Sequence, residues 1–175
     1  MPTQTNLGKA PTSTERELAA LKRRLDYLED MEAIRETLHR YSHTIDNGPF
    51  EAWANVFTED GVFDVFMIDG RKVHKENGRA ELKRYLATKQ LPPNLYDKHL
   101  IASPVITIKG NTATVESYVI LLRETATEGP RVYSWGTYHD TLNKVRGKWL
   151  IKERLASMET RTGKVYKGPV KAPAR

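Results

Sequence analysis

A carboxylate and an imidazole in this sequence could form a general base, although they lie far apart along the chain. Asp46 stands where helical spacing ends, before Asn47-Gly48-Pro49, and His99 opens the strand-like stretch HLIASPVITI. If the fold brings both to one cavity, the carboxylate fixes the imidazole tautomer and stabilises the imidazolium that forms when a proton arrives. Such a pair would also explain an acid in the last turn of a helix, where the macrodipole disfavours negative charge.

Both residues also have plainer interpretations. An aspartate before Asn-Gly is a common turn residue whose side chain bonds nearby backbone, and a histidine at the start of a strand is often only a satisfied polar residue. Tyr41 lies on the apolar stripe of the helix that ends at Asp46. We expect its ring to be buried and its hydroxyl to need a partner.

Other side chains could belong to a site or only to the core. Arg154 could position an anionic or carbonyl group, or it could form a salt bridge with Glu153 or Asp140. Aromatic residues dominate protein cores. Four residues of the strand-rich half could nevertheless line a substrate pocket: Tyr118, Trp135, Tyr138 and His139.

The sequence offers little for a metal or a cofactor. His39 and His43 are four residues apart on one helical face, a spacing that can hold a metal. No third ligand is evident, and zinc sites need at least three protein ligands. The chain has no cysteine, and it lacks a phosphate-cradling glycine loop, a nucleophile elbow and a dinucleotide fingerprint. We expect no metal and no cofactor.

Helical spacing in the first third of the chain predicts the element that presents Asp46. Thr14 and Glu17 predict a capping box, and a second helical phase runs from Met31 to Ile45 after a kink or a turn near Glu29-Asp30. The first part of this helix could pack on a partner subunit or on its own domain. Its leucines have coiled-coil-like spacing: Leu18, Leu21, Leu25 and Leu28.

The rest of the chain predicts an α+β fold. We expect, in order, a short helix (50–57), a turn (58–61), a strand (62–68) with a hairpin signal at Asp69-Gly70, a helix (77–88) and strands from His99 to Met158. Helices, one hairpin, another helix and a long antiparallel meander are typical of helices packed on one face of a sheet. We expect a cone-shaped curved antiparallel sheet with the helices on its concave side, and a small-ligand cavity at the wide end.

Composition indicates one soluble globular domain, since the 175 residues are 39% hydrophobic and 29% charged. The net charge is +6, but residues 161–175 hold five basic residues and no acid, so the rest is nearly neutral. Without a nucleic-acid-reading motif we expect no nucleic-acid partner. No apolar run could span a bilayer, and the polar start lacks a signal peptide's apolar core, which favours a cytoplasmic location without a membrane partner. The expected organisation is a disordered lead (1–12), a domain (13–160) and a flexible basic tail (161–175).

Three stretches carry a recognisable pattern. They are the helix with its following turn, AIRETLHRYSHTIDNGPFEAWANVFTEDGVF, the histidine-led hairpin, HLIASPVITIKGNTATVES, and the ending, YSWGTYHDTLNKVRGKWLIKERL. Together they span about residues 18–160 and resemble the SnoaL-like family of the nuclear-transport-factor-2-like superfamily, whose fold is also called scytalone dehydratase-like.

Within this superfamily the chain looks most like bile-acid 7α-dehydratase. Next come scytalone dehydratase and the dehydrochlorinase that eliminates HCl from hexachlorocyclohexane. In the first enzyme a helix tyrosine, an aspartate five residues later and a strand histidine form the site, and Tyr41, Asp46 and His99 match these positions. The pocket arginine of the dehydrochlorinase corresponds to Arg154. The resemblance implies that these four residues are catalytic.

The implied activity is a cofactor-free lyase of the dehydratase type, acting through a His-Asp base on a small hydrophobic substrate, which could be polycyclic. Isomerisation or cyclisation of a polyketide or a steroid would use the same parts. A third reading is a non-catalytic module that binds a small ligand or dimerises, because fold does not dictate function. The resemblance also implies a homodimer or a homotrimer.

Overall fold

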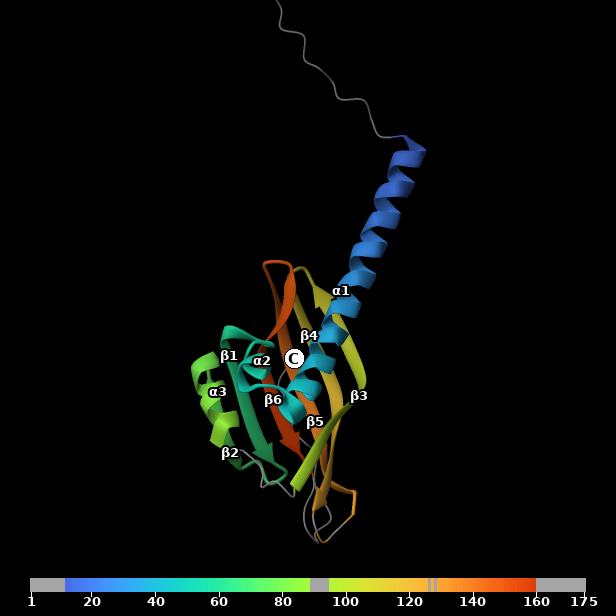
Figure 1. Cartoon of the computed structure of the whole chain (residues 1–175). Helices are drawn as coiled ribbons and strands as arrows, with labels where there is room; N and C mark the ends of the chain where they lie inside the picture. Colours follow the sequence, from blue (N-terminus) through green and yellow to red (C-terminus); the bar gives the residue numbers. More distant parts are fainter. Residues whose placement is uncertain (1–11, 89–94, 126, 128, 160–175) are drawn as a thin grey trace, which may run out of the picture.

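Six strands form one curved sheet, and three helices lie on one side of it (Figure 1). The structure, a computed structural model, describes residues 12–88, 95–125, 127 and 129–159. The helices are α1 (Ser13–Asn47), α2 (Phe50–Ala54) and α3 (Arg79–Thr88). The strands are β1 (Phe57–Met67), β2 (Lys72–Asn77), β3 (Leu95–Lys109), β4 (Thr112–Thr125), β5 (Arg131–Val145) and β6 (Lys148–Met158).

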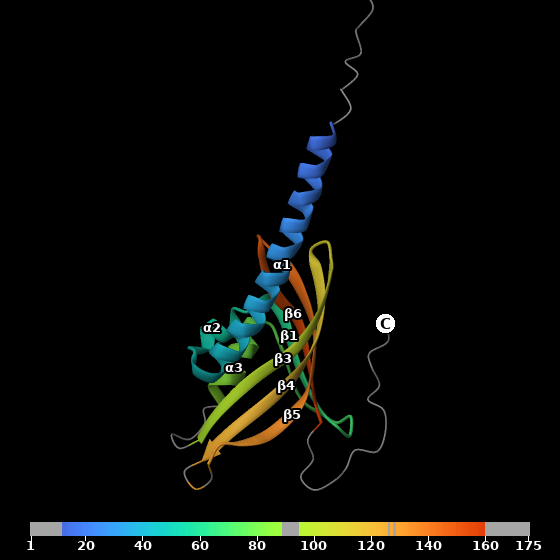
Figure 2. The same ribbon diagram turned by 90° about the vertical axis from the view of Figure 1, so that its right-hand side faces the viewer.

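The order of strands across the sheet is β2-β1-β6-β5-β4-β3. All neighbours run antiparallel except β1 and β6, which are parallel. The view turned by 90° shows the curvature of the long strands and α1 crossing in front of them (Figure 2). The expected α+β class, with a curved sheet and helices packed against it, is confirmed.

Alternation along the strands sends every second side chain into the layer between sheet and helices. On β4, Ala113 and Val115 are buried while the residues on either side of each are exposed. An aromatic cluster lies in this layer, where Trp53 of α2 packs edge-on against Phe57 of β1. This core fixes the position of the second half of α1.

The helix α1 is continuous over 35 residues, so the expected kink or turn near Glu29-Asp30 is wrong. Its capping box uses Thr12 and Glu15, two residues before the expected pair. Only its second half packs on the domain. The first half projects from it as an arm, residues 13–29 (Figure 1).

The loops follow the sequence signals with one exception. The hairpin turn at Asp69-Gly70 is confirmed, with Gly70 at φ 78°. The expected turn at residues 58–61 instead lies inside β1, where the pairing with β6 shifts between Phe57 and Val62. The local turn chemistry produces a bulge because the strand continues on both sides.

The expected disordered lead and basic tail lie outside the described residues, apart from Thr12, which caps α1. No helix among the described residues is long and apolar enough to cross a membrane.

Asp30 joins α1 to the sheet near the connection between β5 and β6. Lys144 Nζ donates to Asp30 Oδ1 at 2.6 Å, and the Trp149 indole N–H donates to the same oxygen at 2.8 Å. Burial by itself raises the pKa of Asp30, but both hydrogen bonds and the Lys144 charge together lower it below the usual 3.8. This contact explains an acid in the middle of the helix without a break.

We predict that Asp30→Ala lowers the free energy of unfolding by about 1–3 kcal/mol, because the buried indole N–H loses its acceptor. The carboxylate has a lower pKa in the folded state, so its ionic contribution is complete above the unfolded pKa of about 3.9. It disappears as the pH falls through the folded value. Denaturant unfolding across this pH range measures both effects.

The matched control is Glu29→Ala, one residue earlier on the exposed side of the helix. A loss no larger than in this control would contradict the anchoring role of Asp30.

Candidate active site

Asp46 and His99 come together where the end of α1 meets the edge strand β3. His99 Nδ1 lies 2.6 Å from Asp46 Oδ1. The backbone N–H of His99 also donates to both oxygens of this carboxylate, at 2.9 and 3.2 Å. The Asp46 side chain is only 5% exposed and the His99 side chain 19%. The juxtaposition expected from the sequence is present across 53 residues of chain.

The physical reason for this contact lies in the two elements. β3 pairs with β4 alone, so its outer edge has backbone groups that need partners from outside the sheet. Asp46 accepts one such N–H, and the imidazole Nδ1 of the same residue lies within hydrogen-bonding distance of this carboxylate. Lys98 supports the junction, since its Nζ donates to Asn47 Oδ1 at 2.7 Å. These donors offset the unfavourable position of an acid at a helix C-terminus.

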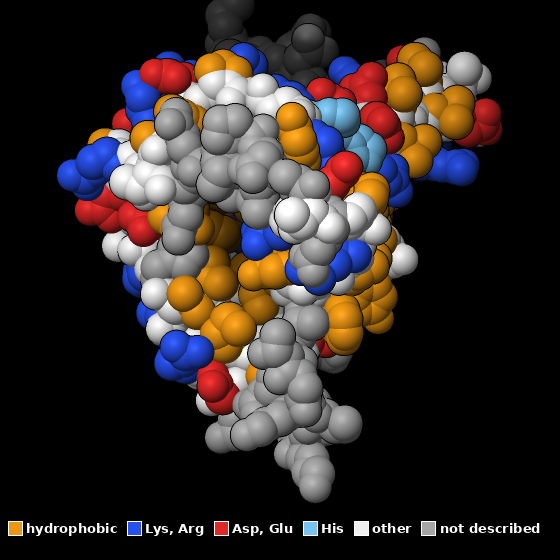
Figure 3. Space-filling view, turned by 60° about the horizontal axis from the view of Figure 1, so that its bottom comes forward, with side chains coloured by type: hydrophobic (Ala, Val, Ile, Leu, Met, Phe, Trp, Pro, Cys, Tyr) orange, Lys and Arg blue, Asp and Glu red, His pale blue; other side chains and the backbone are white. Residues whose placement is uncertain are grey.

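The pair faces a partly open hollow of about 390 Å³ between α1 and β3. The helix contributes a polar wall, and the strands contribute an apolar wall of Leu100, Ile101 and Leu122. In the space-filling view, histidine side chains gather on the surface beside the arm (Figure 3). The remaining lining residues are His39, Ser42, His43, Asn47 and Lys98.

Tyr41 and Arg154 lie elsewhere, in a fully buried cluster under the helix. Arg154 forms a two-pronged ion pair with Asp140, with Nε–Oδ1 at 2.7 Å and Nη2–Oδ2 at 2.6 Å. Its guanidinium carbon lies 3.9 Å from the ring centre of Tyr41 and 4.1 Å from that of Tyr138. The salt bridge with Asp140 considered from the sequence is therefore formed. Neither Tyr41 nor Arg154 lines the hollow that holds the pair.

Two polar atoms of this cluster lack a partner. The Tyr41 hydroxyl and Arg154 Nη1 are buried and make no hydrogen bond of good geometry within the described part of the chain. Burial raises the pKa of the Tyr41 hydroxyl, although the nearby Arg154 charge opposes this shift. Burial by itself lowers the pKa of Arg154, but Asp140 more than reverses it. The arginine is thus a fixed positive charge.

The four residues expected to line a pocket divide between the two faces of the sheet. Tyr138 is buried in the inner layer beside Tyr41. Tyr118 and Trp135 are 61% and 49% exposed, whereas the residues that follow them, Val119 and Gly136, are buried. His139 is paired across the strands with Glu116, and its Nδ1 lies 3.7 Å from a carboxylate oxygen of that residue. These three lie on the outer face, away from the hollow of Asp46 and His99.

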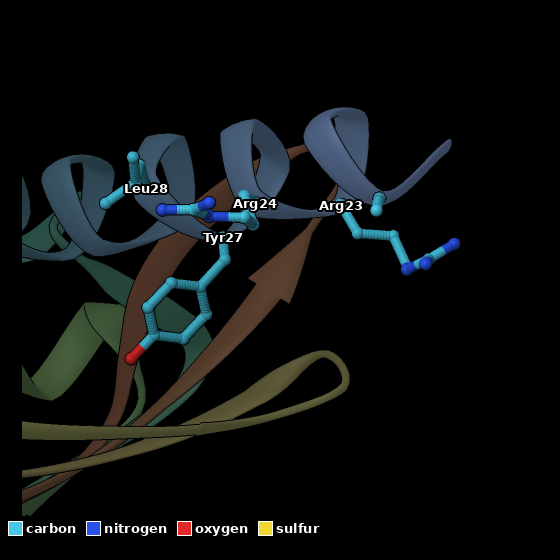
Figure 4. A pocket seen from close by; sticks show the side chains of 5 residues that line it. Arg23, Arg24, Tyr27 and Leu28 are labelled. Atoms are coloured by element: carbon cyan, nitrogen blue, oxygen red, sulfur yellow. The ribbon is translucent and has the colours of Figure 1, made fainter. Parts of the chain in front are cut away.

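A second hollow, of about 520 Å³, lies against the arm and is lined by Ala20, Arg23, Arg24, Tyr27 and Leu28 (Figure 4). None of these five described lining residues is an acid or a histidine. Among the residues described, no three His, Cys, Asp or Glu side chains gather closely enough to hold a metal ion. The chemistry available at the first hollow is therefore that of an imidazole oriented by a carboxylate.

The comparisons with known proteins agree with this architecture. The model of the SnoaL-like domain matches residues 26–155. The chain belongs to the SnoaL-like domain family. No curated protein matches it.

Solved structures share the fold of this SnoaL-like domain. A protein of unknown function from Mycobacterium tuberculosis is 28% identical over 77% of this chain and 74% of its own, with a TM-score of 0.66. An NTF2-like protein with a cystatin-like fold from Novosphingobium aromaticivorans is 21% identical over 83% and 92% of the two chains, with a TM-score of 0.67. ActVI-ORFA from Streptomyces coelicolor is 18% identical over 73% and 96%, with a TM-score of 0.63.

Reasoning from the sequence missed several residues around the site of the SnoaL-like domain. Ser42 and Lys98 line the hollow, but neither was expected there. Helical spacing could have predicted Ser42, since it lies four residues before Asp46 on the same face of the helix. Lys98 had no such signal, because neighbouring strand residues normally point to opposite faces.

We predict that the carboxylate fixes the His99 tautomer. A carboxylate accepts but does not donate, so Nδ1 carries the proton and Nε2 is left as the free base. Long-range ¹⁵N–¹H correlation spectra of the neutral ring should show the Nδ1–H form in the wild type. Asp46→Asn should shift the ring toward the Nε2–H form, whereas Asp26→Asn on the exposed arm should leave it unchanged. An Nε2–H tautomer in the wild type would disprove this orientation.

We also predict that Asp140→Ala lowers the free energy of unfolding by about 3–5 kcal/mol, because Arg154 would remain buried without its counter-ion. Asp97→Ala is the comparison, since it removes the partner of Arg123 in a pair that is partly exposed. Denaturant unfolding of both variants measures the difference. Equal losses would show that the buried ion pair is no more important than the exposed one.

Proposed function

We propose that this SnoaL-like domain catalyses a cofactor-free elimination of the dehydratase type, with His99 as the base. The observation that supports it is the 2.6 Å contact between His99 Nδ1 and Asp46 Oδ1 at the wall of a hollow of about 390 Å³. A general base must be oriented and must also be reachable by substrate. Both conditions hold here, because the carboxylate is nearly buried and the imidazole is partly exposed.

In the proposed reaction, Nε2 of neutral His99 removes a proton from a carbon next to a carbonyl group. Asp46 stabilises the imidazolium that results. The carbon–hydrogen electron pair forms the new double bond while a hydroxyl departs from the neighbouring carbon. The imidazolium returns its proton to this hydroxyl, so that water leaves and the base is regenerated.

The walls of the hollow favour a small and largely apolar substrate. Leu100, Ile101 and Leu122 supply the apolar side, and the volume lies at the lower end of the range for small-molecule sites. A compact polycyclic compound with one carbonyl and one hydroxyl group fits this description. The match of Tyr41, Asp46 and His99 to the site pattern of bile-acid 7α-dehydratase, seen in the sequence, leads us to expect the same class of substrate.

Tyr41 and Arg154 remain part of the proposal as groups that bind a substrate oxygen. Each keeps one buried polar atom without a hydrogen bond of good geometry in the described part of the chain, and leaving such an atom unpaired costs about 1–3 kcal/mol. A substrate oxygen that reached this cluster would satisfy both and would accept hydrogen bonds while negative charge develops. For this role the substrate must extend from the hollow toward the core.

Two other functions use the same geometry. Isomerisation or cyclisation of a polyketide or steroid also begins with proton removal next to a carbonyl group, and the SnoaL-like family includes polyketide cyclases. The family also includes subunits of ring hydroxylases, so a module without catalysis is the second candidate. In that case Asp46 serves only to fasten β3 to α1.

We predict that His99→Gln lowers turnover by about 10²–10⁴-fold while the protein stays folded, because the base is lost. Asp46→Asn should cause a comparable loss through the wrong tautomer, although an amide oxygen can still accept the backbone N–H of β3. The assay is a panel of cyclic β-hydroxy ketones in D₂O. Deuterium uptake next to the carbonyl reports proton removal, and the absorbance of the conjugated enone reports elimination.

The control is Asp26→Asn, which changes the same functional group on the exposed arm. Deuterium uptake without enone formation would favour isomerisation or cyclisation. Ligand binding without deuterium uptake in the wild type, or full uptake in His99→Gln, would favour the non-catalytic module.

A further inference from the structure

The arm of α1 carries an apolar stripe that its own domain leaves exposed. The stripe, here called the leucine seam, consists of Leu18, Leu21, Leu25 and Leu28. Each of these side chains is at least 55% exposed. Monomeric soluble proteins rarely keep four large apolar side chains in one exposed row. We therefore expect a contact from outside the domain to bury the seam.

The seam points away from the domain. An α-helix turns by about 100° per residue, which places the centre of the seam roughly 160° around the helix from the stripe of Ile34, Leu38 and Tyr41. That second stripe is buried in the core. The close-up shows the same division, with Tyr27 directed toward the strands and Leu28 directed away from them (Figure 4). A straight α1 therefore cannot bury the seam against its own sheet.

The spacing of the seam fits a second helix of the same kind. The leucines follow one another at intervals of three, four and three residues, so they occupy alternating a and d positions of a heptad repeat. The next two positions of this repeat are Glu32 and Arg35. The apolar contact is thus confined to the arm and ends where α1 begins to pack on the domain.

Charges beside the seam select both the partner and its direction. In a parallel pair of arms, the g position of one helix faces the following e position of the other. Glu17 then faces Lys22 of the second copy, and Arg24 faces Glu29, so every pair is attractive. In an antiparallel pair, Lys22 would face Lys22 of the second copy, and Arg24 would face Arg24 of the second copy. Like charges would then repel each other. We propose that two copies of this chain associate through their arms as a parallel, two-stranded coiled coil.

The placement of the domains is compatible with this arrangement. Because the core-facing stripe lies nearly opposite the seam, the two domains would lie on the outer sides of the paired arms. Neither the sheet nor the hollow with Asp46 and His99 would need to rearrange. The seam covers only about two heptads, which is short for an independent coiled coil, so we expect a reversible dimer.

The first test is sedimentation equilibrium of the full chain over a wide concentration range. The wild type should sediment as a monomer–dimer equilibrium. Leu21→Glu should raise the dissociation constant by at least about a hundredfold, because a charge in each chain would enter the seam. Ala19→Glu, which adds the same charge beside the seam, should have a much smaller effect. Circular dichroism should show equal helix content in the variants, since Leu21 is exposed in the single chain.

The second test determines the direction of the helices and uses the absence of native cysteine. In a parallel dimer, position 21 meets itself at a distance that a disulfide can bridge, so Leu21→Cys should cross-link under mild oxidation. Ala19→Cys should not. In addition, Lys22→Glu should weaken the dimer, and the further change Glu17→Lys should restore it.

Several outcomes would overturn the proposal. A monomer at all concentrations would show that the seam has no self-association. A dimer that survives Leu21→Glu would place the interface elsewhere, and a trimer would contradict the two-stranded arrangement. Cross-linking of Leu21→Cys only when it is mixed with Leu25→Cys would show that the arms run antiparallel.

Discussion

The carboxylate of Asp46 is the interaction on which the site depends. It accepts the backbone N–H of His99 and contacts the imidazole Nδ1 of the same residue. One group therefore fastens an edge strand to a helix end and also orients a side chain that can accept protons. Neither contact alone would explain an acid at the negative end of a helix dipole. Together they replace the hydrogen bonds to water that the carboxylate loses on burial. They also join α1 and β3, which share no backbone hydrogen bonds, on either side of the hollow.

The position of α1 follows from three anchors of this kind. Asp30 holds the helix to Lys144 and Trp149, the buried hydroxyl of Thr37 donates to the carbonyl of Trp149 at 2.7 Å, and Asp46 holds the end to β3. Between the first and the last anchor the apolar stripe packs on the core. Before Asp30 the helix has exposed leucines instead. The arm is therefore the part of α1 that lies beyond the last polar anchor, and its apolar surface can be buried only by something outside the domain.

Local signals in the sequence predicted the local elements. Strand alternation and the Asp69-Gly70 turn were sufficient for the hairpins, and the α+β class followed from the order of elements. The expected break in α1 was wrong because Asp30 finds its partners 114 and 119 residues later, and spacing within a helix does not contain that information. For the same reason spacing did not reveal which face of β4 and β5 is inner. Aromatic residues stand on both faces, so Tyr138 and Trp135 look alike in the sequence. The pairing of Asp46 with His99 was favoured mainly by the family resemblance, since it joins two distant stretches.

A purely structural role for the pair leaves part of the molecule unexplained. Fastening β3 requires one acceptor for a backbone N–H, which an amide or a hydroxyl could supply without placing a charge at the helix end. It also gives no reason for the buried cluster beneath the helix, where the Tyr41 hydroxyl and Arg154 Nη1 lack partners. Such atoms are rare in protein interiors because each costs free energy without a compensating bond. These two donors lie in the core under α1 and do not line the hollow of Asp46 and His99, so a substrate would have to extend from the hollow into the core to contact both groups. The proposed catalysis would give both features one cause.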